Sequence, residues 1–362
     1  MRKKKRRLKK KVYLFVFLIV CGFILLCSIL FYKVKPSFKK RLNNLGYNSK
    51  EVSIIMENVP KRNYKFIKKY NKDLVNLIKS KDYKDSNFKK YFDYYEKNSN
   101  SDINDIITIV NSGYDFMKYT ASSLLADLVK EKYFIYDNTS RYLDYGNSHD
   151  YNSKKIVAIV NSNADKTFYS DTKSSNLNDD NLVLVNKFNH LSDNYVPTDL
   201  VALSSKYNSG ANNKMRKEAA DKFMEMVDGA LLDNIILKNA SAYRSYNYQV
   251  NLYNSYVQRD GKEKADIYSA RPGYSEHQTG LCTDINTINS SFANTKEAKW
   301  LSENAYKYGF ILRFPKGKED ITGYKYESWH YRYVGKKVSK IIYENDITLE
   351  EYYAYYMEKH TS

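Results

Sequence analysis

Cysteine is scarce in this chain of 362 residues, and the positions of its three cysteines exclude a disulfide framework. Cys21 and Cys27 lie within an uncharged run at residues 12–32, so Cys282 is the only thiol in the rest of the chain. One cysteine cannot close a disulfide within its own domain, and roughly 330 residues bury a sizeable core without one. Val and Leu precede Cys21 and Cys27, not the small residue that a lipoprotein site requires, so we expect no lipidation.

The N-terminus also lacks the small-residue pattern of a cleavable signal peptide. Nine of the first eleven residues are Lys or Arg, and the apolar run at 12–32 continues directly into Lys33. At 1.5 Å per residue a helix of this length covers roughly 30 Å, enough to cross a bilayer once. Because positive charge stays on the cytoplasmic side, we expect a cytoplasmic arm, a single-pass signal anchor in the cell membrane, and an extracellular remainder.

The net charge of +18 does not indicate a nucleic-acid partner. The N-terminal arm carries nine of these charges, which leaves an excess of +9 on the rest of the chain. A mild positive excess on an exported domain suits the anionic polymers and lipid head groups of a cell envelope. We therefore expect no binding to nucleic acid.

Three stretches between the apolar run and about residue 170 share a helical pattern, at 47–56, 103–112 and 151–160. Ser49 and Ser153 stand where helix N-caps are expected in two of them. We interpret the region as a packed helical stalk and prefer this to a dedicated wall-binding module, because repeats by themselves mark only architecture.

Beyond a polar, turn-rich stretch at 171–181, the pattern changes to that of an α+β domain. Apolar residues at helical spacing predict a helix at 215–230, and a second helix is expected after Asn294 and to end near Gly309. The stretches expected to be strands are residues 235–237, 281–285, 310–314 and 329–334.

Two short segments carry the chemistry, Ser275–Asp284 and Glu327–His330. His277, Asp284 and His330 supply the two imidazoles and the carboxylate of a catalytic zinc site with an open fourth position. A strand at 281–285 would direct Asp284 and Cys282 to one face. Glu327 is a fourth ligand or a general base; since three ligands are already present, we assign it to proton transfer.

Arg244 and Gln249 precede these segments, at an expected junction between a strand and a helix. A guanidinium there would bind a substrate carboxylate or stabilise an oxyanion, and the alternative for an isolated Arg is a surface salt bridge. The remaining histidines have no partner carboxylate at a telling spacing, and we do not expect them to be ligands: His149, His190 and His360.

From about residue 180 to 335 the chain resembles the VanY-type D-alanyl-D-alanine carboxypeptidases, zinc peptidases of bacterial cell walls. The resemblance lies in Tyr243–Ser245 with Gln249, in residues 269–280 with Asp284, and in Glu327–His330. It implies one Zn²⁺ on His277, Asp284 and His330, Glu327 as general base and acid, and substrate contacts from Arg244, Gln249 and Ser275. We expect Tyr274 and Trp329 to set the depth of the pocket.

Cys282 departs from the family pattern, because similar proteins usually carry Ala there. A thiolate beside zinc would close the open position and convert a catalytic site to a structural one. We favour the other interpretation, in which Cys282 replaces Ala as a small apolar side chain.

We therefore predict a membrane-anchored zinc D-alanyl-D-alanine carboxypeptidase that trims peptidoglycan stem peptides. An L,D-carboxypeptidase acting on tetrapeptide stems and a non-catalytic, zinc-containing wall-binding protein are the alternatives. The expected fold is a compact zinc-peptidase domain of the α+β class, with a small antiparallel sheet flanked by helices. No oligomeric state is predicted. The predicted regions are a basic arm at 1–11, the anchor at 12–32, the stalk at 33–170, a linker at 171–181, the catalytic domain at 182–345 and a tail at 346–362.

Overall fold

A computed structural model describes residues 16–22 and 37–358 of the chain. Residues 16–22 are helical. Within the described ranges, no helix is both long and apolar enough to cross a membrane. The predicted basic arm and most of the predicted signal anchor at 12–32 lie outside the described residues.

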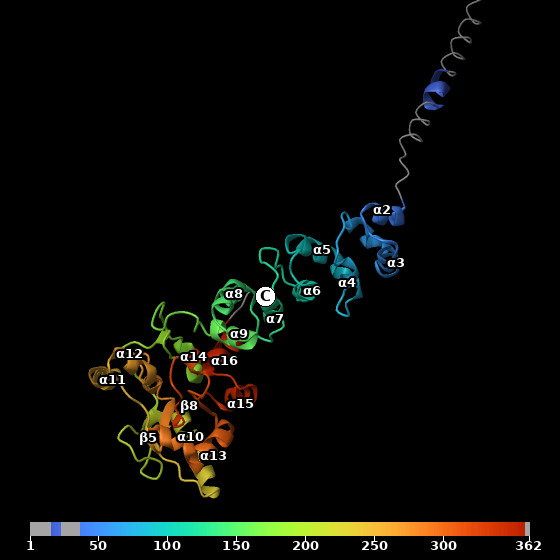
Figure 1. Cartoon of the computed structure of the whole chain (residues 1–362). Helices are drawn as coiled ribbons and strands as arrows, with labels where there is room; N and C mark the ends of the chain where they lie inside the picture. Colours follow the sequence, from blue (N-terminus) through green and yellow to red (C-terminus); the bar gives the residue numbers. More distant parts are fainter. Residues whose placement is uncertain (1–15, 23–36, 359–362) are drawn as a thin grey trace, which may run out of the picture. The chain divides into compact units, whose positions relative to one another are not determined.

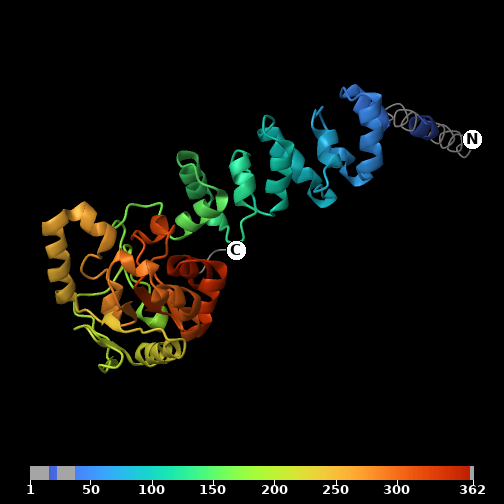
Figure 2. The ribbon, with the colours of Figure 1, turned by 60° about the horizontal axis from the view of Figure 1, so that its bottom comes forward.

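The chain divides into two compact units, Met1–Ala126 and Asp127–Ser362. The first is helical in its described part, shown in blue and teal in Figure 2. Its helices are α2 (Phe38–Asn44), α3 (Ser49–Asn58), η1 (Lys61–Phe66), α4 (Leu74–Lys79), η2 (Asp85–Asn87), α5 (Phe88–Lys97), α6 (Ile103–Asn111) and α7 (Ser123–Leu128), whose last two residues belong to the second unit.

The predicted N-caps are wrong by one residue. Asn48 caps α3 by accepting from two backbone N–H groups, and Asn152 caps α9 (Ser153–Asn161) by accepting from the backbone N–H of Lys155. Ser49 and Ser153 are instead the first residues of their helices. An Asn side chain reaches the N–H groups of the first turn as well as a Ser side chain does, so the two adjacent residues compete for the position.

Two copies of the repeat contain the same polar pair. The buried Tyr91 of α5 donates its hydroxyl to Asn111 Oδ1 at 2.6 Å, where α6 ends. Tyr142 of α8 (Thr139–Ser148) makes the equivalent bond to Asn161, where α9 ends. A buried hydroxyl requires such a partner, so this pair fixes the packing of each helix against the next.

The second unit contains α8 and α9 as well as the mixed helix and sheet domain (Figure 1). The sequence led us to group α8 and α9 with the stalk, whereas in the structure they pack with the domain that holds the sheet. Lys155 of α9, for example, pairs with Asp320 at 2.7 Å. The stretches expected to be a linker and a tail also carry structure here, including the short strand β1 (Lys173–Ser174) and the helix α16 (Leu349–Tyr352) with its fully buried Leu349.

The predicted small antiparallel sheet is confirmed, with strand order β5-β6-β8-β7. Its strands are β5 (Asn239–Ser241), β6 (Cys282–Ile285), β8 (His330–Tyr333) and β7 (Phe310–Leu312). The first strand was expected at 235–237 and begins later. Asn234 has a left-handed φ of 59° and Ile235 N donates to Ala230 O, so these residues close the end of the preceding helix.

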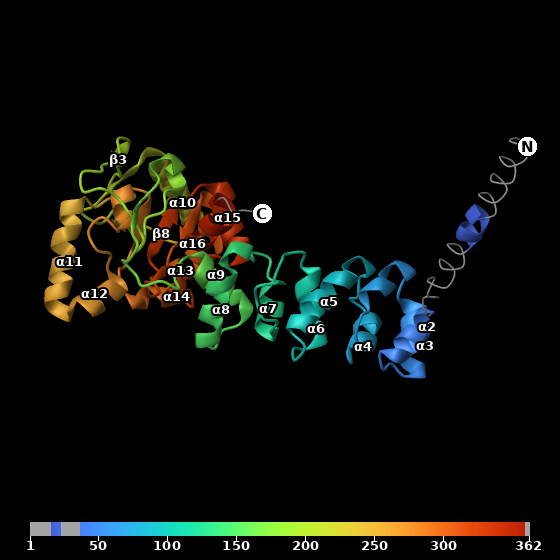
Figure 3. The same ribbon diagram turned by 90° about the horizontal axis from the view of Figure 1, so that it is seen from above.

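Helices cover the sheet. One core packs α10 (Lys217–Leu232) and α13 (Lys296–Asn304) against Leu281 and Ile285, and a second gathers α15 (Lys336–Asn345) and α16 around Ile311. Figure 3 shows α11 (Tyr246–Asp260) and α12 (Lys262–Tyr268) lying next to each other at the edge of this unit. The remaining elements are η3 (Tyr136–Asn138), η4 (Leu177–Leu182), β2 (Asn189–His190), β3 (Leu200–Ala202), β4 (Lys214–Arg216), η5 (Glu276–Thr279), η6 (Ser290–Asn294), η7 (Ala305–Tyr308), α14 (Glu319–Thr322) and η8 (Tyr353–Met357).

Candidate metal centre and active site

The sheet register brings two of the predicted ligands together. Asp284 of β6 lies directly opposite His330 of β8 in the antiparallel ladder. Leu281 and Ile285 join the core on the other face, as the predicted alternation required. Cross-strand neighbours have Cβ atoms about 5 Å apart, so ladder pairing alone places a carboxylate beside an imidazole.

A short turn brings His277 to the same place. η5 ends at Thr279 and is capped by Gly280, whose φ of 69° lies in the left-handed region, and the chain then enters β6. A Cβ at this position would lie 2.8 Å from Leu200 Cδ2, the movable end of a side chain, so glycine is favoured here mainly by the left-handed conformation. The backbone N–H of Arg244 donates to His277 O at 3.1 Å and ties the turn to the chain after β5.

Each imidazole presents a different nitrogen to the site. His277 Nδ1 lies 2.7 Å from the carbonyl of Ala242, which makes it the donor and leaves Nε2 as the ligand atom. His330 Nδ1 lies 3.0 Å from Asp284 Oδ1, and His277 Nε2 lies 3.4 Å from Asp284 Oδ2. Ligand atoms bound tetrahedrally at 2.0–2.1 Å lie about 3.3 Å apart. The Asp284 carboxylate therefore lies at metal-ligand spacing from both Nδ1 of His330 and Nε2 of His277.

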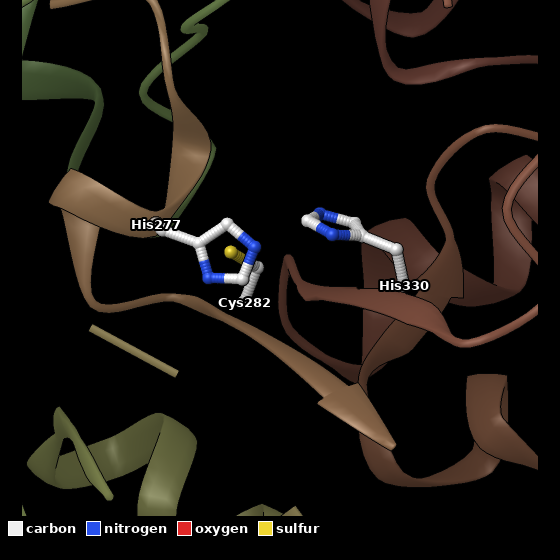
Figure 4. A group of neighbouring side chains, drawn as sticks. All are labelled: His277, Cys282 and His330. Atoms are coloured by element: carbon white, nitrogen blue, oxygen red, sulfur yellow. The ribbon is translucent and has the colours of Figure 1, made fainter. Parts of the chain in front are cut away.

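Cys282 lies next to the same two imidazoles. Figure 4 shows both rings and the sulfur together, and one ligand atom from each of these residues lies within 4.8 Å of the other two. Burial raises the pKa of the Cys282 thiol, but the neighbouring imidazoles outweigh burial and lower it to about 7. The sulfur therefore lies close enough to the two imidazoles to share a metal with them, and replacing Cys282 by Ala distinguishes a ligand from a small apolar side chain.

Arg244 supplies a positive charge at the ligands. Its terminal nitrogen donates to Asp284 Oδ2 at 2.9 Å and contacts His277 Nε2 at 2.6 Å. Burial alone would raise the pKa of Asp284, but the two imidazoles and this guanidinium hold it well below its usual range. A metal ion on these atoms would repel Arg244 and compete for the same lone pairs, so metal binding requires the guanidinium to move into the cavity that it lines.

Glu327 and His330 belong to one turn, in which the backbone N–H of His330 donates to Glu327 O at 3.2 Å. Both side chains line the same cavity. Glu327 is only 9% exposed, and this burial raises the pKa of its carboxyl to about 7. A carboxyl group with a pKa near neutrality suits general acid–base catalysis.

The predicted site residues meet in a cavity of about 430 Å³, a size typical of small-ligand sites. Gln249 accepts from Arg244 at 3.4 Å and donates to Ala270 O at 2.8 Å. Tyr274 bonds Thr172 through its hydroxyl at 3.3 Å. The sequence-predicted residues that line the cavity are Arg244, Gln249, Tyr274, Ser275, His277, Asp284, Glu327, Trp329 and His330.

The sequence interpretation missed a buried cluster of charges behind the ligands: Glu276, Arg313, Arg332 and Glu350. Its one available signal was position, because Glu276 precedes His277 and Arg332 follows His330 by two residues on the same strand face. From the sequence alone, charged side chains at such positions are expected to be exposed to solvent. Their buried partners are distant along the chain and become known only from the structure.

Residues 212–336 match the family model VanY, described as D-alanyl-D-alanine carboxypeptidase. YodJ of Bacillus subtilis is 47% identical over 181 residues, 48% of this chain and 66% of that protein. The Enterococcus gallinarum protein named bifunctional D-Ala-D-Ala dipeptidase and D-Ala-D-Ala carboxypeptidase VanXYC is 33% identical over 182 residues, 48% of this chain and 94% of that protein.

Among solved structures, that of the LdcB LD-carboxypeptidase, described as revealing the molecular basis of peptidoglycan recognition, has 44% identity and a TM-score of 0.49. The match covers 51% of this chain and 91% of that one. Three of the curated relatives, YodJ among them, are matched over 66%, 60% and 65% of their lengths, less than two thirds of each.

Proposed function

Because the chain belongs to the VanY family of D-alanyl-D-alanine carboxypeptidases, whose members are zinc peptidases, we propose that it removes the terminal D-alanine from peptidoglycan stem peptides. The observation that carries the proposal is that Asp284 lies within 3.4 Å of His277 and within 3.0 Å of His330 in a cavity that Glu327 and Arg244 also line. Ligands without a base would suffice for a structural metal. Ligands beside a buried carboxyl with a pKa of about 7 suit hydrolysis.

His277, Asp284 and His330 would hold the zinc, which would supply a Lewis acid for the scissile carbonyl and would lower the pKa of water. Glu327, ionised near neutral pH, accepts the proton of the attacking water and returns it to the departing amine. Its burial keeps bulk water from competing for that proton. Arg244 stabilises the negative charge that develops on the carbonyl oxygen or on the terminal carboxylate.

A carboxypeptidase must also recognise a free terminal carboxylate. Arg244 offers a charged fork, while Gln249 and the buried Ser275, which line the same cavity, offer neutral hydrogen bonds. Tyr274 and Trp329 also line the cavity, and we infer that they limit the side chain that it accepts to a small one such as the methyl group of D-alanine. One methyl group gives modest discrimination, about 1 to 3 kcal/mol.

Two alternative functions are distinguished by the product analysis described below. An L,D-carboxypeptidase would use the same ligands and base on tetrapeptide stems. A wall-binding protein would keep the metal but would have no need for the buried Glu327. The relative VanXYC, which is named for D-Ala-D-Ala substrates, supports the D,D assignment.

Location at the membrane is also part of the proposal. The nine basic residues followed by 21 uncharged ones support a signal anchor with the catalytic unit outside the cell. Such an anchor would hold the enzyme beside newly made peptidoglycan.

The test is mass spectrometry of products from purified stem peptides treated with the full chain. We expect release of one D-alanine from pentapeptide and weaker cleavage of tetrapeptide. A chelator should abolish release and added zinc should restore it. Preferred cleavage of tetrapeptide would establish the L,D alternative, and peptide binding without any cleavage would establish the binding protein.

A further inference from the structure

We propose that Glu276 is a positioning residue of the metal centre: its Oε2 accepts from Nε2–H of His330 and so reserves Nδ1 of that ring for the metal. This inference rests on the zinc site of the proposed function. It assigns a task to a carboxylate that is not itself a ligand and does not handle the proton of the reaction.

The geometry singles out one oxygen of Glu276. Oε1 accepts from Arg313 Nε at 2.7 Å and from Arg332 Nη1 at 2.8 Å. Oε2 has no hydrogen-bond partner among the described residues, and the same holds for His330 Nε2. These two buried atoms lie 3.6 Å apart. Buried polar atoms without partners are rare in folded proteins, and here a donor and an acceptor face each other.

The surrounding charges keep Glu276 an acceptor. Two guanidinium groups contact its Oε1, those of Arg313 and Arg332, and their positive charge favours the carboxylate form. Arg313 also pairs with Glu350, at 2.8 and 2.6 Å. Two carboxylates and two guanidinium groups thus balance in the interior, and an ionised carboxylate can only accept hydrogen bonds.

The consequence for His330 follows from imidazole chemistry. A neutral ring carries one N–H, and a metal binds the nitrogen without it. Nδ1 of His330 faces Asp284, the proposed third ligand, so a metal bound at Nδ1 leaves the ring proton on Nε2, and Glu276 is the acceptor that faces Nε2. His277 has the opposite arrangement: its Nδ1–H donates to the Ala242 carbonyl, which leaves Nε2 free of the proton. Such outer partners orient metal-binding imidazoles and raise their basicity.

Glu276→Gln tests the proposal, with Glu350→Gln as the matched control. In Glu276→Gln the amide oxygen would keep the two Arg contacts, so the amide NH₂ would face Nε2–H of His330. Both groups are donors, and no hydrogen bond could form between them. We expect zinc affinity, measured on the full chain by competition with a chromophoric chelator, to fall about 10- to 100-fold. Glu350→Gln removes the same buried charge without facing His330, and we expect an affinity within about threefold of wild type.

Thermal melting of the metal-free proteins checks that both variants fold. Equal loss of zinc affinity in the two variants would show that only charge balance matters, and would overturn the proposal. So would unchanged affinity in Glu276→Gln. A wild-type protein that binds zinc but cleaves no stem peptide would instead defeat the proposed function and leave the affinity comparison intact.

A measurement on the wild type covers the case in which Glu276→Gln does not fold. In zinc-loaded protein with ¹⁵N-labelled histidine, long-range NMR correlations reveal which ring nitrogen carries the proton. The His330 ring can be identified by its contacts with Phe314, whose ring centroid lies 5.0 Å away. We expect Nε2–H, and a proton on Nδ1 would refute the proposal.

Discussion

Replacing Glu327 by Gln should nearly abolish turnover while zinc stays bound. The carboxyl is almost fully buried, and Gln has nearly the same shape, so the change removes the proton acceptor without opening the cavity. Loss of a general acid–base group typically slows a reaction 10²- to 10⁴-fold. That corresponds to about 2.7 to 5.4 kcal/mol in the activation free energy.

Both quantities can be measured on one preparation. Release of D-alanine from pentapeptide gives kcat and KM, and elemental analysis gives zinc per chain. Glu303→Gln is the control, because it makes the same chemical change at an exposed helix position. Activity in Glu327→Gln above about a tenth of wild type, with zinc in place, would refute the assignment of Glu327 as the base. Loss of zinc would indicate that Glu327 is a ligand.

The pH dependence provides an independent check on the same residue. Burial raises the pKa of Glu327 from 4.5 to about 7, Asp284 adds to the rise, and His330 opposes it. Only the ionised form accepts a proton, so kcat/KM should rise with pH and then level off. A metal cation nearby favours ionisation, so we expect the midpoint of this rise between pH 4.5 and about 7. Glu327→Gln should lack this rise, and its persistence in the variant would assign it to another group.

Three further outcomes follow from the site. His330→Ala should strip most of the zinc, since it removes one of three ligands; full occupancy by elemental analysis would exclude His330 from the ligand set. Cys282→Ala should leave zinc content and kcat unchanged, as expected of a small apolar side chain, whereas a marked gain in kcat would show that the thiolate occupies the open position. Amidation of the pentapeptide's terminal carboxylate should strongly reduce cleavage, because Arg244 loses its anionic partner; equal rates by mass spectrometry would favour an endopeptidase on wall cross-links.

Local patterns in the sequence sufficed for two helices of the catalytic unit, α10 and α13, and for three of the four strands of the sheet. β6, β7 and β8 lie where alternating or continuous apolar residues predicted them, because burial on one or both faces leaves a period of two along the chain. The N-caps were predicted less accurately. Ser49 and Asn48 are adjacent and chemically equivalent as caps, and only the geometry of the folded turn selects Asn48.

Domain limits depend on interactions that no local pattern contains. α8 and α9 carry the same repeat as the helices before them, yet they belong to the unit that holds the sheet. The pairing of Lys155 with Asp320 joins residues that are far apart along the chain, and the short strand β1 acquires its structure by pairing with β2. Composition marked 171–181 as polar, which is a property shared by linkers and by surface segments of a folded domain.

The sequence by itself determined which residues we propose as ligands and base, because His277, Asp284, Glu327 and His330 stand at spacings typical of a catalytic zinc site. Tertiary structure alone decided which nitrogen of each imidazole faces the proposed metal position. Those choices depend on the Ala242 carbonyl and on Glu276, whose charge is held in turn by Arg313 and Arg332. A hydrogen bond acts over about 3 Å in space and is indifferent to separation along the chain, so the acceptors behind the ligands could be identified only after the strands had brought them together.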